Sequence, residues 1–221
     1  MKPDNFIVGA PGKQHIIYIV DFGLAKRYKD VRTKEHIAFS DGKDITGTVR
    51  YASVNNHNGF EQSRRDDMES LGFTVLYLFK GRLPWQGIKR AEKAEKYEAI
   101  KQAKESLTDE EASKDIPVAI VNYIKHCREL KFEQRPNYEH LKRLFKDAYA
   151  KEGFARDNLF DWFVQKSAAP KEKVTLERRR VISNTNTLNI RREKENIRKN
   201  NTQETYIQSL MPSIEFYNRQ I

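Results

Sequence analysis

The chain has 221 residues, of which 38% are hydrophobic, 11% aromatic and 33% charged, and its formal net charge is +10 at pH 7. This length suits one domain with an extension, since a single core stops growing efficiently beyond about 250–300 residues, and the apolar content excludes a collagenous or wholly disordered chain. The single cysteine, Cys127, cannot form a disulfide within the chain, which indicates a reducing compartment and predicts a cytoplasmic or nuclear protein.

Two short β-rich runs open the chain. Residues 6–8 and 16–20 are separated by Ala10-Pro11-Gly12-Lys13, which has the composition of a turn, so we expect a β-hairpin. The segment that follows, residues 21–63, has no sustained hydrophobic period. A connection of that length inside a compact domain is usually functional or disordered.

Helical patterns begin at Asp66. Residues 66–79 are apolar around nearly the whole circumference, which is typical of a helix inside a fold, and Gly81 ends the pattern. The apolar stretch is about half the ~18 residues of a membrane span, and the N-terminus has no apolar signal, so we predict neither membrane insertion nor secretion. Three amphipathic helices are expected after it, over residues 89–106, 116–130 and 138–149.

The charge of the chain is unevenly distributed. Residues 1–165 carry 29 basic and 25 acidic side chains, whereas residues 166–221 carry 12 basic and 6 acidic ones. The second segment has little apolar surface to offset the entropy of ordering, so we predict a folded domain over residues 1–165 and a basic, flexible tail over residues 166–221. Its Arg178-Arg179-Arg180 run suits nucleic acid or an acidic partner, but a plain solvated extension is the favoured interpretation.

Two motifs flank the predicted hairpin. Lys2-Pro3-Asp4-Asn5 precedes the first strand, and Asp21-Phe22-Gly23 follows the second. Their order and spacing match the kinase signature, in which the catalytic loop ends in Asn and a D-F-G follows after a short hairpin. Because Mg²⁺ prefers hard oxygen ligands, we expect Asn5 and Asp21 to hold the Mg²⁺ that accompanies ATP. Lys2 is the candidate catalytic residue, since it would place a positive charge at the transferred phosphate.

Further segments make a family resemblance specific. They are DFGLAK at residues 21–26, TGTVRYAS at 46–53, EQSRRDDMESLG at 61–72 and LPWQG at 83–87. From residue 2 to about residue 163 the chain resembles the casein kinase 1 family of serine/threonine protein kinases. Where most kinases read A-P-E, residues 52–55 read Ala-Ser-Val-Asn, similar to the casein kinase 1 variant. The resemblance implies a mainly α fold, the C-terminal lobe of a kinase with a short β-hairpin near its N-terminus.

The resemblance also implies an activity and a substrate class. It implies transfer of the γ-phosphate of ATP to Ser or Thr of acidic or previously phosphorylated proteins. We expect the chain to be a monomer. An anion pocket near the activation segment is implied as well, and the matching positions are Arg50, Lys43 and Lys26, with Lys96 as a further member. Guanidinium and ammonium groups that converge on one phosphate form charge-assisted hydrogen bonds. Solvated surface charge is the alternative for each of these residues.

Two parts of the kinase signature, the catalytic Asp and the Gly-rich phosphate loop, are not found in the 221 residues. Counting back from Asn5 places the catalytic Asp one residue before Met1, and no G-x-G-x-x-G phosphate loop occurs. We therefore expect the chain to be inactive by itself, because nothing accepts the proton of the substrate hydroxyl and nothing covers ATP. A fragment of a complete kinase is the favoured interpretation, since Lys2, Asn5 and Asp21 keep active-site identities. The alternative is a catalytically dead protein-interaction module that retains the anion pocket.

The five histidines show no spacing typical of metal ligands, so no zinc site is predicted. Arg135, which precedes Pro136, resembles an arginine late in the kinase domain and is expected to be a structural ion-pair partner.

Overall fold

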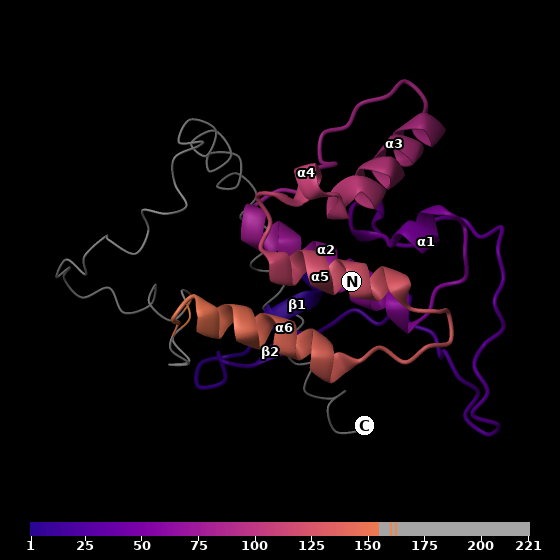
Figure 1. Cartoon of the computed structure of the whole chain (residues 1–221). Coiled ribbons are helices and arrows are strands. Elements are labelled where there is room, and N and C mark those ends of the chain that lie inside the picture. Colours follow the sequence, from indigo (N-terminus) through magenta and orange to yellow (C-terminus); the bar gives the residue numbers. More distant parts are fainter. Residues whose placement is uncertain (155–159, 161, 163–221) are drawn as a thin grey trace. The chain divides into compact units, whose positions relative to one another are not determined.

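The computed structural model of the chain describes residues 1–154, 160 and 162 (Figure 1). The prediction of a mainly α fold with a short β-hairpin near the N-terminus is confirmed. The predicted tail, residues 166–221, and the predicted domain boundary at residue 165 lie outside the described residues and stay predictions.

The helical elements follow one another along the chain after the hairpin. The strands are β1 (Phe6–Val8) and β2 (Ile17–Ile19), and the helices are η1 (Pro3–Asn5), η2 (Val49–Tyr51), α1 (Val54–His57), α2 (Arg64–Lys80), α3 (Lys93–Glu105), η3 (Ser106–Thr108), α4 (Glu110–Ser113), α5 (Val118–Glu129) and α6 (Tyr138–Lys151). The three predicted amphipathic helices correspond to α3, α5 and α6. Within the described part of the chain, no helix combines the length and the apolar character that a membrane span requires.

The hairpin is a two-stranded antiparallel sheet in which Phe6 pairs with Ile19 and Val8 with Ile17. The turn of the hairpin passes so close to Gly9, the residue after β1, that a Cβ there would lie 2.3 Å from the Lys13 carbonyl oxygen. Only glycine fits at this position. The register extends one step beyond the strands, where the Val20 amide donates to the Asn5 carbonyl at 2.9 Å. The hairpin therefore brings the two sequence motifs at its open end together.

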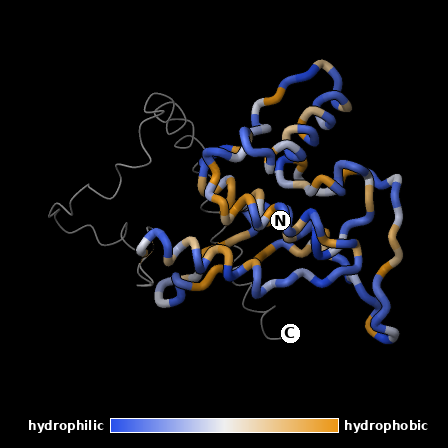
Figure 2. The backbone as a smooth tube through the Cα atoms, viewed as in Figure 1, coloured by the Kyte–Doolittle hydropathy of each residue, from blue (hydrophilic) through white to orange (hydrophobic). Residues whose placement is uncertain are grey.

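The core lies among the helices that follow. Phe73 and Leu76 of α2 have no exposed surface, and α2 packs closely on α5, where a Cβ on Gly72 would lie 2.9 Å from Ile124 Cγ1. Figure 2 shows hydrophobic residues recurring along these helices. The prediction of a helix buried on all sides is wrong at its C-terminal end, where Leu78 is 68% exposed and Phe79 48%. Hydrophobicity alone does not reveal which side of a helix finds a neighbour.

The long segment between the hairpin and α2 is anchored by aromatic rings. His36 lies edge-on to Phe132, the residue that follows α5 by three positions, with ring centroids 4.8 Å apart. Phe39 contacts the same ring at 5.4 Å. The Arg64 guanidinium, at the start of α2, lies 4.3 Å from the centre of the Tyr28 ring. These contacts attach residues 28–39, whose backbone forms only one isolated β-bridge between Lys29 and His36, to the helical block.

Candidate functional site

The open end of the hairpin brings Asn5 and Asp21 together. Asn5 ends η1, and its Nδ2 donates to the Val20 carbonyl and to Asp21 Oδ2, each at 3.3 Å. The two side chains predicted as metal ligands thus face each other, although 16 positions separate them in the chain.

Asp21 adopts a backbone conformation that is uncommon for a residue with a side chain. Its φ is 64°, in the left-handed region, where non-glycine residues pay about 1–3 kcal/mol of strain and aspartate is among the more tolerant. The conformation lets Oδ1 accept a hydrogen bond from the Gly23 amide at 3.3 Å while Oδ2 accepts from Asn5. A strained backbone persists only where the surrounding structure holds it, and such residues are concentrated at functional sites.

The donor set at this position fits a hard divalent cation. A carboxylate and a side-chain amide are ligands that Mg²⁺ takes, usually together with water and phosphate oxygens. The Asn5 amide presents its nitrogen to Asp21. To ligate a cation through oxygen, the amide would turn about its Cβ–Cγ bond, which exchanges the two atoms. Among the described residues, no group of three or more His, Cys, Asp or Glu is arranged to hold a metal by itself.

Lys2 lies beside Asn5 in the chain and is half-buried. Its backbone carbonyl accepts a hydrogen bond from the Asn5 amide at 3.0 Å. The Lys2 ammonium has no ion pair with any acid of the described residues, so it is not bound to Asp21.

Two of the four residues predicted for the anion pocket meet on one acid. Lys26 Nζ pairs with Glu61 Oε1, and Lys43 Nζ lies 3.8 Å from Glu61 Oε2, with both lysine side chains about half exposed. The hydrogen bond from Lys26 is the main reason that the pKa of Glu61 is lowered, and the Gln62 amide adds to the effect. The pairing of both lysines with an internal carboxylate was not predicted from the sequence.

Arg50 and Lys96 lie elsewhere. Arg50 is the middle residue of η2 and is exposed, with its guanidinium carbon 6.0 Å from the centre of the Tyr51 ring. Lys96 is exposed in α3. Neither side chain forms an ion pair within the described part of the chain, and neither joins the lysines on Glu61.

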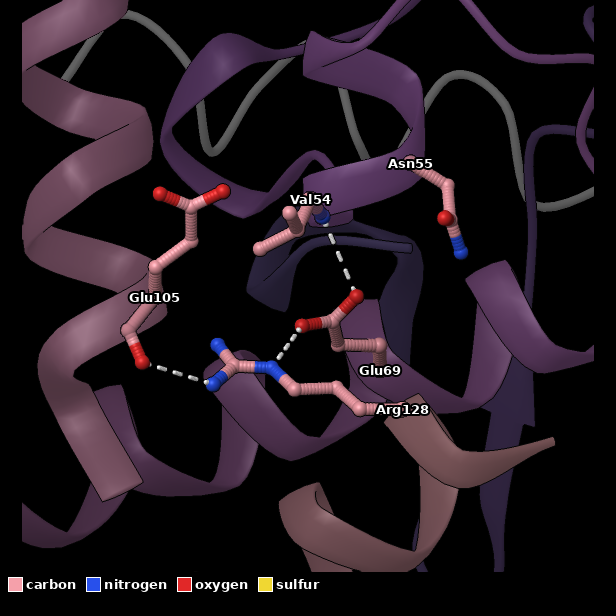
Figure 3. Close-up of a pocket in the computed structure, with 5 residues that line it drawn as sticks. All are labelled: Val54, Asn55, Glu69, Glu105 and Arg128. Carbon is pink, nitrogen blue, oxygen red and sulfur yellow. Dashed lines mark hydrogen bonds and ion pairs between the residues drawn. The ribbon is translucent and has the colours of Figure 1, made fainter. Parts of the chain in front are cut away.

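A polar cavity of about 280 Å³ lies close to α1 (Figure 3). Val54, Asn55, Glu69, Glu105 and Arg128 line it. Arg128 Nε donates to Glu69 Oε1 at 2.8 Å, and the Val54 amide donates to Glu69 Oε2 at 3.1 Å. Glu69 and Arg128 are therefore bound to one another, and Arg128 Nη1 also donates to the Glu105 backbone carbonyl at 3.1 Å, which favours a structural role for this ion pair.

The Glu69–Arg128 ion pair was not predicted from the sequence, and Arg135 was expected instead to form a structural ion pair with an acid that was not named. That expectation is wrong: no described acid pairs with Arg135, whose guanidinium carbon lies 6.0 Å from the centre of the Tyr138 ring. One signal was available. Glu69 lies between Met68 and Leu71, within the stretch that was predicted to be buried, and a buried acid requires a partner.

A match to a known protein family covers the candidate site residues described above. A family model described as protein kinase domain matches residues 1–146, more than half of the chain. The matched stretch begins with the residues before the hairpin and ends within α6. It contains every candidate ligand and anion-binding residue named above.

Proposed function

The chain belongs to the protein kinase family, and on this premise we propose that it is the C-terminal lobe of a casein kinase 1-like serine/threonine kinase. The observation that carries the proposal is the meeting of Asn5 and Asp21 at the open end of the hairpin, 3.3 Å apart. The casein kinase 1 part of the proposal rests on the TGTVRYAS segment and on the Ala-Ser-Val-Asn that stands at residues 52–55.

In the complete enzyme the two ligands would hold Mg²⁺ with ATP, and Lys2 would steady the γ-phosphate. Bound Mg²⁺ would neutralise charge on the ATP phosphates. The left-handed backbone at Asp21 supports this role, because it turns the carboxylate back toward Asn5. The Asn5 amide would orient the Asp21 carboxylate before the nucleotide arrives, which reduces the reorganisation that binding requires.

The proposed substrates are Ser and Thr residues of acidic or previously phosphorylated proteins. Arg50, Lys43, Lys26 and Lys96 would bind the anionic group. The basic character of these side chains and the partial exposure of Lys26 and Lys43 support the assignment. An incoming phosphate would share the two lysines with Glu61 or displace it.

The 221 residues contain neither a Gly-rich phosphate loop nor the acid that accepts the substrate proton. We propose that this polypeptide alone does not transfer phosphate. The enzyme would act as a monomer in the cytoplasm or nucleus.

A second candidate function is a non-catalytic module that binds acidic or phosphorylated proteins. The Lys26–Glu61–Lys43 cluster favours it, since this cluster is complete without a nucleotide.

A metal titration tests the assignment of Asn5 and Asp21. Mn²⁺, which reports its own binding through paramagnetic relaxation, is titrated into the 221-residue chain with ATP present. We expect Asp21→Asn and Asn5→Ala each to weaken binding about tenfold, as loss of one metal ligand does. Asp30→Asn is the matched control, because an amide oxygen there can still accept from the Arg32 and Thr33 amides. Equal Mn²⁺ binding by all four proteins would contradict the assignment.

A phosphotransfer assay tests the proposed inactivity. The chain with Mg-ATP and casein should show no turnover. Turnover that disappears in Asp21→Asn would overturn the inactivity of the chain, while it would support the kinase assignment. Capture of a phosphoserine peptide without turnover would agree with either candidate function.

A further inference from the structure

Side chains from later parts of the chain bind the backbone carbonyls of η2. Trp85 Nε1 donates to the Arg50 carbonyl at 2.8 Å. Lys104 Nζ donates to the Val49 carbonyl at 2.8 Å and to the Ala52 carbonyl at 2.6 Å. A 3₁₀-helix of three residues has little stability of its own, so these hydrogen bonds determine where its backbone lies.

Lys104 is an unusual residue for this task because it has no exposed surface. Lysine is almost never fully buried unless its ammonium is paired. The third contact of its Nζ is with His57 Nε2 at 3.0 Å, so three acceptors match the three donors of an ammonium. A neutral amine would still donate to both carbonyls and accept from the His57 ring, and η2 is therefore held in either protonation state. The rings of Phe73 and Trp85 close the site at 5.2 and 5.3 Å.

Lys104 is itself held by the ion pair that lines the cavity of Figure 3. Arg128 Nη2 donates to the Lys104 backbone carbonyl at 2.6 Å, while Arg128 Nε binds Glu69. The other oxygen of Glu69 accepts from the Val54 amide at the start of α1. One connected set of polar groups, in which Glu69 and Lys104 are buried and Arg128 is partly buried, therefore runs from α2 and α5 through α3 to η2.

We propose that Lys104 and Trp85 are positioning residues, which hold η2 so that the Arg50 guanidinium is presented to the anionic group of the substrate. This inference rests on the proposed function, in which Arg50 binds that group. Its geometry is two-sided: the carbonyls around Arg50 face buried donors, while the Arg50 side chain is exposed. An arginine on a fixed backbone loses less entropy when it binds an anion, because part of the ordering has already been done.

The test is a titration of the 221-residue chain with inorganic phosphate, followed by NMR at the arginine Nε–H and tryptophan indole resonances. Trp85→Phe removes one hydrogen-bond donor and keeps an aromatic ring against Phe73. Lys104→Met removes the two hydrogen bonds from Lys104 Nζ to the Val49 and Ala52 carbonyls. We expect each variant to weaken phosphate binding about fivefold, the equivalent of one hydrogen bond, and Lys104→Met to shift the Trp85 indole resonance.

Lys101→Met is the matched control for the loss of charge. Lys101 lies in the same helix, one turn earlier, and pairs with Glu98 at 2.8 Å rather than with η2. Its substitution should change phosphate affinity less than about twofold, as expected for a partly exposed ion pair.

The outcomes separate this inference from the proposed function. If Arg50→Gln loses phosphate binding while Trp85→Phe and Lys104→Met keep full affinity, Arg50 binds the anion and the positioning role is overturned. If the wild-type chain binds no phosphate, or Arg50→Gln binds it unchanged, the anion-binding assignment fails and the positioning role fails with it. Should Lys104→Met not fold, the affinity of Trp85→Phe decides alone.

Discussion

The hairpin end and the η2 region both carry candidate chemistry, but they are held in different ways. Among residues 1–50, Gly9 is the only buried residue. The hydrogen bonds that place Asn5 and Asp21 are partly buried or exposed to solvent. In contrast, Tyr51 at the end of η2 is 4% exposed, and the lysine that binds this segment has no exposed surface.

This difference predicts how function and stability are coupled in each region. An ordinary hydrogen bond contributes about 0.5–1.5 kcal/mol, whereas leaving a buried charge without its partner costs several kcal/mol. Substitutions at the hairpin should therefore change ligand binding with little effect on folding. Substitutions in the buried network around η2 should change both.

The largest effect is expected for Arg128→Met. It leaves the Glu69 carboxylate, which is 2% exposed, without its ion-pair partner, and we expect the free energy of unfolding to fall by about 3–5 kcal/mol. Urea denaturation measures the loss. Lys142→Met is the control, since the exposed Lys142–Glu139 pair should contribute less than about 0.5 kcal/mol. Equal losses in the two variants would remove the contrast between buried and exposed regions.

The pH dependence of stability should report the same network. Burial is the main reason that the pKa of His57 is lowered to about 4, and Lys104 adds to the effect. Between pH 6.5 and 4 the unfolded chain binds a proton that the folded chain does not, so stability should decrease as the pH is lowered through this window, by up to about 1.4 kcal/mol per pH unit. Urea midpoints measured from pH 7 to pH 4 would check the slope.

His57→Gln separates this residue from other acid-sensitive groups, because the glutamine amide can still accept from Lys104 but does not titrate in this range. The variant should lose most of the slope below pH 6.5, whereas His15→Gln, a change at an exposed position, should keep it. An unchanged slope in His57→Gln would show that the histidine is not the source.

Lys104 should determine the alkaline part of the pH profile of stability. Burial, with Arg128 adding to it, lowers the pKa of Lys104 to about 7, while Glu69 acts in the other direction. Between pH 7 and pH 10.5 the unfolded chain holds a proton that the folded chain has released, so this residue should make stability rise with pH in that window. Lys104→Met, if it folds, should lack the rise; a wild-type midpoint that falls steadily above pH 7 would contradict the expectation.

Gly72→Ala should have a smaller effect, in the helical block. Its Cβ would lie 2.9 Å from Ile124 Cγ1, and overpacking of this kind costs about 1–3 kcal/mol, partly offset by the roughly 1 kcal/mol that alanine gains over glycine in a helix. We expect a net loss of about 1 kcal/mol in urea denaturation. Combining it with Ile124→Ala should show favourable coupling, because the clashing atom is gone. A stabilised Gly72→Ala would mean that α2 and α5 adjust freely.

The sequence predicted what depends on neighbouring residues. The hairpin and the amphipathic helices follow from local periodicity and turn composition, and the meeting of Asn5 with Asp21 follows from a motif spacing that spans one hairpin. The Glu69–Arg128 pair and the contacts of Lys104 with η2 and with Ala52 after it were not predicted, because they join residues 52 to 59 positions apart. Such contacts depend on how helices pack, and only a charged residue in an apolar run hints at them.

The smallest change in stability is expected at Asp21. Asp21→Gly removes two 3.3 Å hydrogen bonds but also removes the strain of a side chain at φ 64°, and the two effects should cancel to within about 0.5 kcal/mol. Mn²⁺ binding with ATP should nevertheless weaken by about tenfold or more, since the carboxylate is gone. Urea denaturation and the Mn²⁺ titration, performed on the same preparation, measure both. A loss of stability above about 1 kcal/mol would show that the hairpin end is coupled to the fold as tightly as η2, and ligand replacement there could not then be read as a functional change alone.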